Sequence, residues 1–125
     1  MVYENFSRIM NEACEAAHEN AERHGFYFDS NATLNYLENK DQPKHAETVE
    51  MNFVLAQMAK ITSEIGEAVH VIQHGGDYDM LGEEMADIVI RTMDLAGYLG
   101  IKLGSCISAK MIKNATRPYK HGKIC

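Results

Sequence analysis

The sequence predicts an all-α protein. Apolar residues recur at intervals of three and four over several long segments, and no segment alternates with period two for long enough to form a convincing strand. Glycine and proline stand where the periodic segments end. At 125 residues the chain is one domain by length. We therefore expect a protomer of four to five helices arranged like a bundle and, because small helical domains often bury a limited core, completed by oligomerisation.

The N-terminal part, residues 1–46, is predicted to hold one helix and a loop. Apolar positions at helical spacing run through residues 3–24, and Gly25 is a plausible stop. Residues 26–45 mix Asp, Asn and Ser clusters with Pro43, which favours a loop containing at most one short turn of helix.

The core helices are expected within residues 47–117. One helix is predicted over 47–73 and a second over 80–99, separated by the breaking sequence HGGDYD and ended by Gly100. A last helix over 103–117 stops before Pro118, and residues 118–125 form a C-terminal tail.

Charge is divided unevenly along the chain. Residues 1–94 carry all 18 acidic residues and six of the 12 basic ones, a formal balance of −12, whereas the part after Asp94 holds six basic residues and no acid. A large acidic region is unfavourable for wrapping DNA, so we expect no nucleic-acid partner. The division suits a site in which acids bind metal ions and basic groups hold an anionic ligand, although a solvated basic tail would produce the same split.

The cellular location is predicted from what the chain contains. No stretch approaches the roughly 20 apolar residues that span a bilayer, and acids stand near the N-terminus where a secretion signal would be apolar. Cys14, Cys106 and Cys125 are odd in number and widely spaced, which favours reduced thiols in a cytoplasm.

Two pairs of carboxylates carry the strongest chemical signal. Glu64 and Glu67 are three residues apart on one predicted helix, and Glu84 and Asp87 are three apart on the next. Residues at i and i+3 share a helix face, and a short connection makes the two helices antiparallel neighbours. Four converging carboxylates need cations, and hard divalent ions such as Mg²⁺ or Mn²⁺ prefer oxygen ligands. A pair of this kind on one helix is otherwise typical of a solvated face.

A carboxylate-bridged di-iron site is a rival interpretation. Glu15–His18 and Glu67–His70 are both ExxH pairs, and Glu84 offers one of the two further glutamates that such a site requires. The predicted last helix contains no acid, so the second glutamate is missing.

Basic and amide side chains line one face of the last predicted helix. Lys110, Asn114 and Arg117 are spaced i, i+4 and i+7, and their donors suit phosphate oxygens. The tail beyond Pro118, with Tyr119, Lys120, His121 and Lys123, is placed to fold over a ligand.

These motifs resemble a known family. The segments SEIGEAVHVI and GEEMADIVIRTMDLAGYLGI are similar to the ExxE…ExxD signature of MazG-like nucleoside triphosphate pyrophosphohydrolases, and KMIKNATRPYKHGK is similar to the ending of a MazG-like subgroup. The resemblance covers about residues 47–123. It implies that Glu64, Glu67, Glu84 and Asp87 bind Mg²⁺ and that Lys110, Asn114 and Arg117 contact the phosphates of a nucleoside triphosphate. It also implies a homodimer or homotetramer, with helices from two chains completing the bundle.

The expected reaction is hydrolysis between the α and β phosphates, giving a monophosphate and pyrophosphate. The four acids would serve as catalytic residues by holding metal ions, with Glu83 a candidate proton acceptor. No GxxxxGK[ST] loop is present, which excludes a P-loop cradle. Two alternatives stay open: hydrolysis of dUTP/dUDP or phosphoribosyl-ATP on the same scaffold, and a non-catalytic helical oligomer that binds or regulates.

The residues that would recognise the base are not determined by the sequence. Phe53, Tyr78 and Tyr98 are candidates for stacking, although aromatic residues at helical spacing more often belong to the core. Tyr98 continues a stripe through Asp87, Arg91 and Asp94 and so can line the site. Arg91 and Asp94 can instead form an ion pair, within the helix or between subunits.

Overall fold

The computed structural model describes residues 3–40 and 42–118 and contains five helices there. They are α1 (Glu4–Arg23), α2 (Phe28–Asn39), α3 (Pro43–Gln73), α4 (Tyr78–Leu99) and α5 (Leu103–Ala115). No strand occurs in the part of the chain that the structure describes, so the all-α prediction is confirmed.

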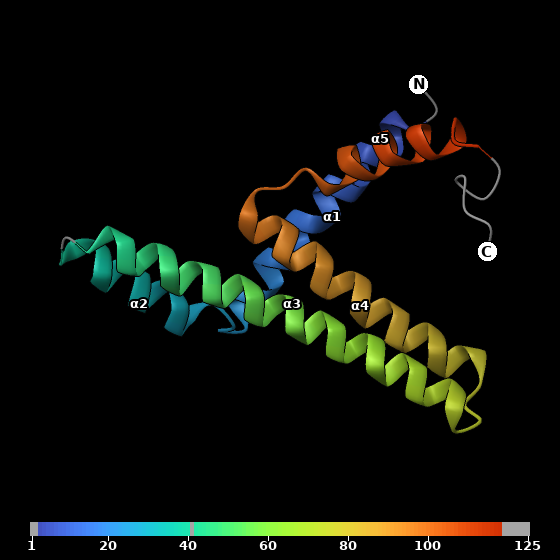
Figure 1. Ribbon diagram of the computed structural model, residues 1–125, viewed down its shortest axis with the longest axis horizontal. Coiled ribbons are helices and arrows are strands. Elements are labelled where there is room, and N and C mark those ends of the chain that lie inside the picture. Colours follow the sequence, from blue (N-terminus) through green and yellow to red (C-terminus); the bar gives the residue numbers. More distant parts are fainter. Residues whose placement is uncertain (1–2, 41, 119–125) are drawn as a thin grey trace.

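The long helix α3 organises the protomer (Figure 1). Helix α2 packs along its N-terminal half, and α4 runs antiparallel to its C-terminal half. Helix α1 contacts α4, and α5 packs on α1 at the far end of the elongated molecule. Among the described residues, no helix combines the length and the apolar character needed to cross a membrane.

The connection between α3 and α4 explains their antiparallel arrangement. Gly75, with φ of 75°, adopts a left-handed conformation that suits glycine and turns the chain back. The Asp77 carboxylate then accepts a 2.8 Å hydrogen bond from the Met80 backbone N–H, which caps the start of α4. The two predicted pairs of acids are thereby carried on neighbouring helices.

The prediction of a loop over residues 26–45 is wrong for most of that segment. Helix α2 occupies Phe28–Asn39, and α3 begins at Pro43 rather than near residue 47. The Asp, Asn and Ser residues favour turns locally, but Leu34 and Leu37 are half-buried where α2 packs against α3. Tertiary packing therefore overrides the local turn preference.

Helices α1 and α4 approach each other closely at Gly97. A Cβ atom at this position would lie 2.6 Å from the Cys14 carbonyl oxygen and 2.6 Å from the His18 Cβ. Only a residue without a side chain fits this crossing. The contact fixes α1 against the C-terminal part of α4 and so positions one wall of the cavity described below.

Candidate metal and nucleotide site

Three of the four predicted acids meet between α3 and α4. One carboxylate oxygen from each of Glu64, Glu84 and Asp87 lies within 4.8 Å of the other two. Glu64 is buried, with 9% of its surface exposed, whereas Asp87 is exposed. Glu84 Oε2 is buried and has no hydrogen-bond partner. An orphaned buried carboxylate oxygen is costly unless a cation satisfies it.

Glu67 lies at the edge of this cluster and responds to it. Hydrogen bonding to Glu64, followed by the negative charge of Glu64, raises the pKa of Glu67 above its usual value, and Glu84 adds to the effect. The electrostatics of Glu67 are therefore linked to those of Glu64 and Glu84. Their metal-binding and catalytic roles remain predictions.

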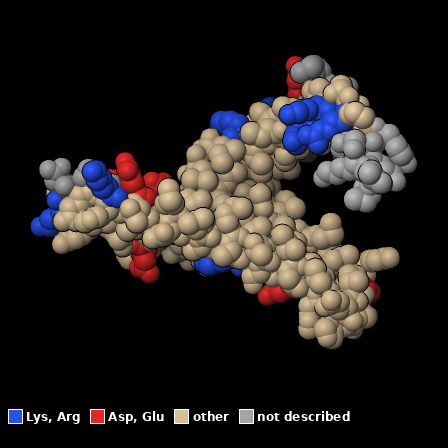
Figure 2. All heavy atoms as spheres, in the orientation of Figure 1, with Lys and Arg blue, Asp and Glu red and all other residues tan. Residues whose placement is uncertain are grey.

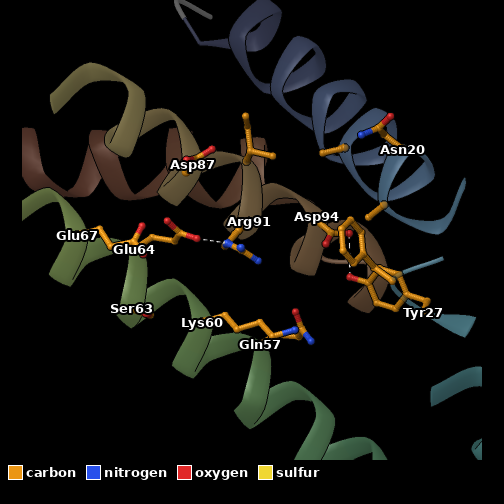
Figure 3. A pocket seen from close by; sticks show the side chains of 14 residues that line it. Asn20, Tyr27, Gln57, Lys60, Ser63, Glu64, Glu67, Asp87, Arg91 and Asp94 are labelled. Carbon is orange, nitrogen blue, oxygen red and sulfur yellow. Dashed lines mark hydrogen bonds and ion pairs between the residues drawn. The ribbon is translucent and has the colours of Figure 1, made fainter. Parts of the chain in front are cut away.

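A cavity of about 490 Å³ extends from the acids toward the N-terminal helices. Figure 3 shows Arg91 in its middle, with Glu64, Glu67 and Asp87 at one end and Tyr27, Asn20 and Asp94 at the other. The walls come from α1, the link between α1 and α2, α3 and α4. The lining residues are Ala17, Asn20, Ala21, Phe26, Tyr27, Gln57, Lys60, Ser63, Glu64, Glu67, Asp87, Ile90, Arg91 and Asp94.

Arg91 and Asp94 do not form the intrahelical ion pair that the sequence left open. Arg91 Nε instead donates to Glu64 Oε1 on α3 at 2.6 Å. Asp94 Oδ1 accepts a 2.8 Å hydrogen bond from the Tyr27 hydroxyl and lies 3.1 Å from His18 Nδ1. Both side chains thus join α4 to other helices.

The aromatic residues near the cavity form a packed cluster. Tyr98 stacks on Tyr27 with ring centroids 5.0 Å apart and meets the Phe53 ring edge-on at 5.2 Å. Tyr98 and Phe53 do not line the cavity, and Tyr78 is 85% exposed at the start of α4. Tyr27 and Phe26 line it instead. Both stand in the segment predicted to be a loop, where no helical spacing pointed to them.

Three further polar residues of the cavity are not among those predicted from the sequence. Asn20 and Gln57 carry no local signal, because only the packing of the helices brings them together. Lys60 does carry a local sequence signal, because it precedes Glu64 by four residues and so shares its helix face.

The predicted phosphate-binding residues lie elsewhere in the chain. Lys110 and Asn114 are exposed on α5 and Arg117 follows its end, and none of the three lines the cavity. Figure 2 shows basic atoms gathered over α5. Within one chain the structure therefore does not bring this strip to the acids. The tail residues Tyr119, Lys120, His121 and Lys123 are outside the described residues.

The di-iron alternative finds no support in the described part of the chain. The group of residues close enough to hold a metal ion contains no histidine. His18 lies between Asp94 and Glu22, and Glu15 pairs with Lys102 at 3.5 Å. Glu83, the candidate proton acceptor, is exposed and does not line the cavity.

The fold and the acid cluster together define an all-α protein with an oxygen-rich site able to hold a metal ion. The MazG nucleotide pyrophosphohydrolase domain matches residues 54–121, which is more than half of the chain. The chain belongs to this family. No curated protein and no solved structure matches the chain in the corresponding comparisons. The matched range holds all four acids, whereas α1 and the link between α1 and α2, which supply the far wall of the cavity, precede it.

Proposed function

We propose that this chain is a Mg²⁺-dependent nucleoside triphosphate pyrophosphohydrolase that cleaves between the α and β phosphates. The observation that carries the proposal is the convergence of Glu64, Glu84 and Asp87 at the end of a cavity of about 490 Å³. Cavities of 300–1,000 Å³ are typical for small-molecule ligands. The family match supports the same class of reaction.

The residues present fit a hard divalent cation. All donors are carboxylate oxygens, one of which, Glu84 Oε2, is buried without a partner. Glu64, Glu84 and Asp87 would hold Mg²⁺, or Mn²⁺ in its place, with Glu67 at the edge. When bound, the cation supplies Lewis acidity toward phosphate oxygens and water.

The chain's own side chains provide the rest of the site. Lys60 and Arg91 are the basic residues among those lining the cavity, and both stand within one or two helical turns of the acids. Their charges would orient the triphosphate and offset the negative charge that develops on the leaving pyrophosphate. Tyr27 and Asn20 at the opposite end leave room for the nucleoside.

We further propose that two or more copies assemble through α3. Apolar residues follow one face of this helix at alternating intervals of four and three, interrupted only by Thr62, and all are exposed by 47–66%. They are Met51, Leu55, Met58, Ile65, Val69 and Ile72. Such a stripe is typical of a helix–helix seam. A second copy would also be a source of the basic α5 strip, whose charge complements the acidic cavity.

We propose a cytoplasmic location for this activity. It is supported by the free thiols of Cys14 and Cys106 in the described residues.

The activity is tested with a panel of nucleotides, measuring pyrophosphate and orthophosphate separately with Mg²⁺ and with a chelator. The panel includes dUTP, dUDP and phosphoribosyl-ATP, so that the alternative substrates are resolved by the same experiment. We expect pyrophosphate release that requires the metal. A chain that hydrolyses none of these compounds would be the non-catalytic alternative.

Asp87→Asn is the variant of choice, because Asp87 is exposed and its replacement leaves the α3–α4 core intact. Its activity should fall by about 100-fold or more, the scale of loss when a group that stabilises transition-state charge is removed. Asp79→Asn on the exposed first turn of the same helix is the matched control. Full activity of Asp87→Asn would refute the assignment.

A further inference from the structure

Arg91 neutralises a buried member of the acid cluster. Its Nε donates to Glu64 Oε1 at 2.6 Å, which is a short, charge-assisted contact. The Glu64 side chain is only 12% exposed, whereas that of Arg91 is 45% exposed. The ion pair is therefore buried on the carboxylate side and open on the guanidinium side.

The same carboxylate belongs to the group that would hold the cation. A Glu64 oxygen lies within 4.8 Å of oxygens from Glu84 and Asp87. A divalent cation in that position would compete with the guanidinium for Glu64, and the two positive charges would repel each other across a few ångströms. Occupation by one disfavours the other.

Arg91 has an open space to enter when it leaves Glu64. It lines the cavity between the acids and the Tyr27 end (Figure 3). Asp94 lies one turn further along α4 and already accepts a hydrogen bond from the Tyr27 hydroxyl and contacts His18. It is therefore a poor alternative partner for Arg91. An anionic group in the cavity is then the complementary ligand for the planar guanidinium.

We propose that Arg91 is an exchangeable counter-ion: it holds Glu64 in the metal-free chain, gives way to the divalent cation, and then binds phosphate oxygens of the ligand in the cavity. The inference rests on the proposed function for the identity of the cation and the ligand. It makes metal binding and phosphate binding mutually supportive, because the cation releases the residue that the phosphate needs.

The first test is a calorimetric titration of the full chain with Mg²⁺ or Mn²⁺ in the absence of nucleotide. Arg91→Gln removes the guanidinium that competes with the cation for Glu64, so the metal affinity of this variant should rise by about ten-fold. The metal affinity of Arg91→Lys should lie between those of Arg91→Gln and the wild type. Arg8→Gln, which breaks an exposed pair with Glu12 on α1, should leave the affinity unchanged. Unchanged or weaker metal binding by Arg91→Gln would overturn the proposal.

A second measurement separates exchange from a merely structural role. In chelator, Arg91→Gln should unfold at a lower temperature than the wild type, because the buried Glu64 loses the guanidinium with which it pairs. With saturating Mg²⁺ the difference should largely disappear, since the cation replaces the guanidinium. An equal loss in both conditions would mean that Arg91 only holds the helices together.

The phosphate half is tested with pyrophosphate as the probe, in the presence of saturating Mg²⁺. Its affinity should fall by about ten-fold in Arg91→Gln and recover partly in Arg91→Lys. Unchanged affinity would overturn this half. The metal titration needs no turnover, so the two proposals can fail separately. If the wild type is inactive but Arg91→Gln binds the metal more tightly, the proposed function is wrong and the exchange stands. If the wild type shows Mg²⁺-dependent activity but Arg91→Gln has unchanged metal affinity, the exchange is wrong and the proposed function stands.

Discussion

The Tyr27 hydroxyl donates a 2.8 Å hydrogen bond to Asp94 Oδ1 and so ties the N-terminal segment to the helix that carries two of the site acids. Tyr27 is only 2% exposed, and its ring stacks on that of Tyr98. The bond links a part of the chain outside the family match to a part within it. One wall of the cavity therefore depends on this contact.

Tyr27→Phe should lower the free energy of unfolding by about 1 kcal/mol, the typical net value of such a hydrogen bond. It should also raise the KM for nucleotide more than it lowers kcat, because the wall is remote from the acids. Denaturant unfolding and steady-state kinetics measure the two effects. Tyr36→Phe, at a position 62% exposed on α2, is the control and should change neither.

The same tyrosine gives the stability a pH dependence. Burial first, and then the hydrogen bond to Asp94, raises the pKa of Tyr27 above its usual 10.0. The folded chain therefore keeps a proton that the unfolded chain releases above that pH. The free energy of unfolding should fall as the pH rises past about 10, by ~1.4 kcal/mol per pH unit for this one proton, and Tyr27→Phe should flatten the decline. An identical slope in the variant would contradict this assignment.

The sequence was sufficient to predict the helices that follow a clear period. Helices α3 and α4 have apolar residues at helical spacing and are followed within two residues by a glycine, so local pattern predicts both. Helix α2 was missed because its Asp, Asn and Ser content favours turns, and its stability comes from packing on α3. Local sequence does not report such packing.

Glu67→Gln should stabilise the metal-free chain at neutral pH. Hydrogen bonding to Glu64 and the charge of that residue raise the pKa of Glu67 above 4.5, so the folded chain binds more protons here than the unfolded one. The stability linked to this group is present below pH 4.5 and is lost as the pH rises through the folded pKa. In chelator, the unfolding temperature should decrease less between pH 4 and pH 7 for Glu67→Gln than for the wild type.

Glu12→Gln serves as the control, because Glu12 is exposed on α1 away from the cluster. It should follow the wild-type pH profile. A Glu67→Gln variant that tracks the wild type would show that the acids do not repel one another in solution.

Metal binding should stabilise the wild-type chain and not Glu84→Gln. A ligand at 100 times its Kd adds about 2.7 kcal/mol to the free energy of unfolding. Glu84 Oε2 is buried without a partner, so replacing the carboxylate should remove most of the Mg²⁺-dependent rise in unfolding temperature. Thermal unfolding with Mg²⁺ and with chelator measures the difference. An equal rise in the variant would exclude Glu84 from the metal site.

The convergence of the acids on neighbouring helices was predictable from the sequence, whereas the basic residue that pairs with them was not. The i, i+3 spacing and the short connection place Glu64 and Asp87 on facing helices whatever the detailed packing. Arg91 could reach an acid on its own helix or on the neighbouring α3, and spacing alone does not decide between them. The position of α5 had no local signal either, because its contact with α1 spans almost the whole chain.

Gly97→Ala should destabilise the chain by about 1–3 kcal/mol, the usual cost of overpacking a tight contact. The added methyl group would lie 2.6 Å from the Cys14 carbonyl oxygen, so α1 and α4 must separate. Gly82→Ala on the same helix is a matched control, because a Cβ there meets nothing within 4 Å. It should be neutral or stabilise by up to about 1 kcal/mol. Denaturant unfolding of both variants compares them directly.

Val69→Glu should dissociate the assembly proposed for α3. Val69 is 50% exposed in the single chain and lies in the apolar stripe, so a charge there leaves the protomer intact but would be buried in a helix–helix seam. Light scattering should show a mass above 14.0 kDa for the wild type and a monomer for the variant. Ala56→Glu, exposed on α3 outside the stripe, should retain the wild-type mass.

If the basic α5 strip acts across the seam, Val69→Glu should also lose nucleotide affinity. Its metal affinity should be unchanged, because the acids come from one chain. A monomeric wild-type chain with full activity would show that a single copy completes the site.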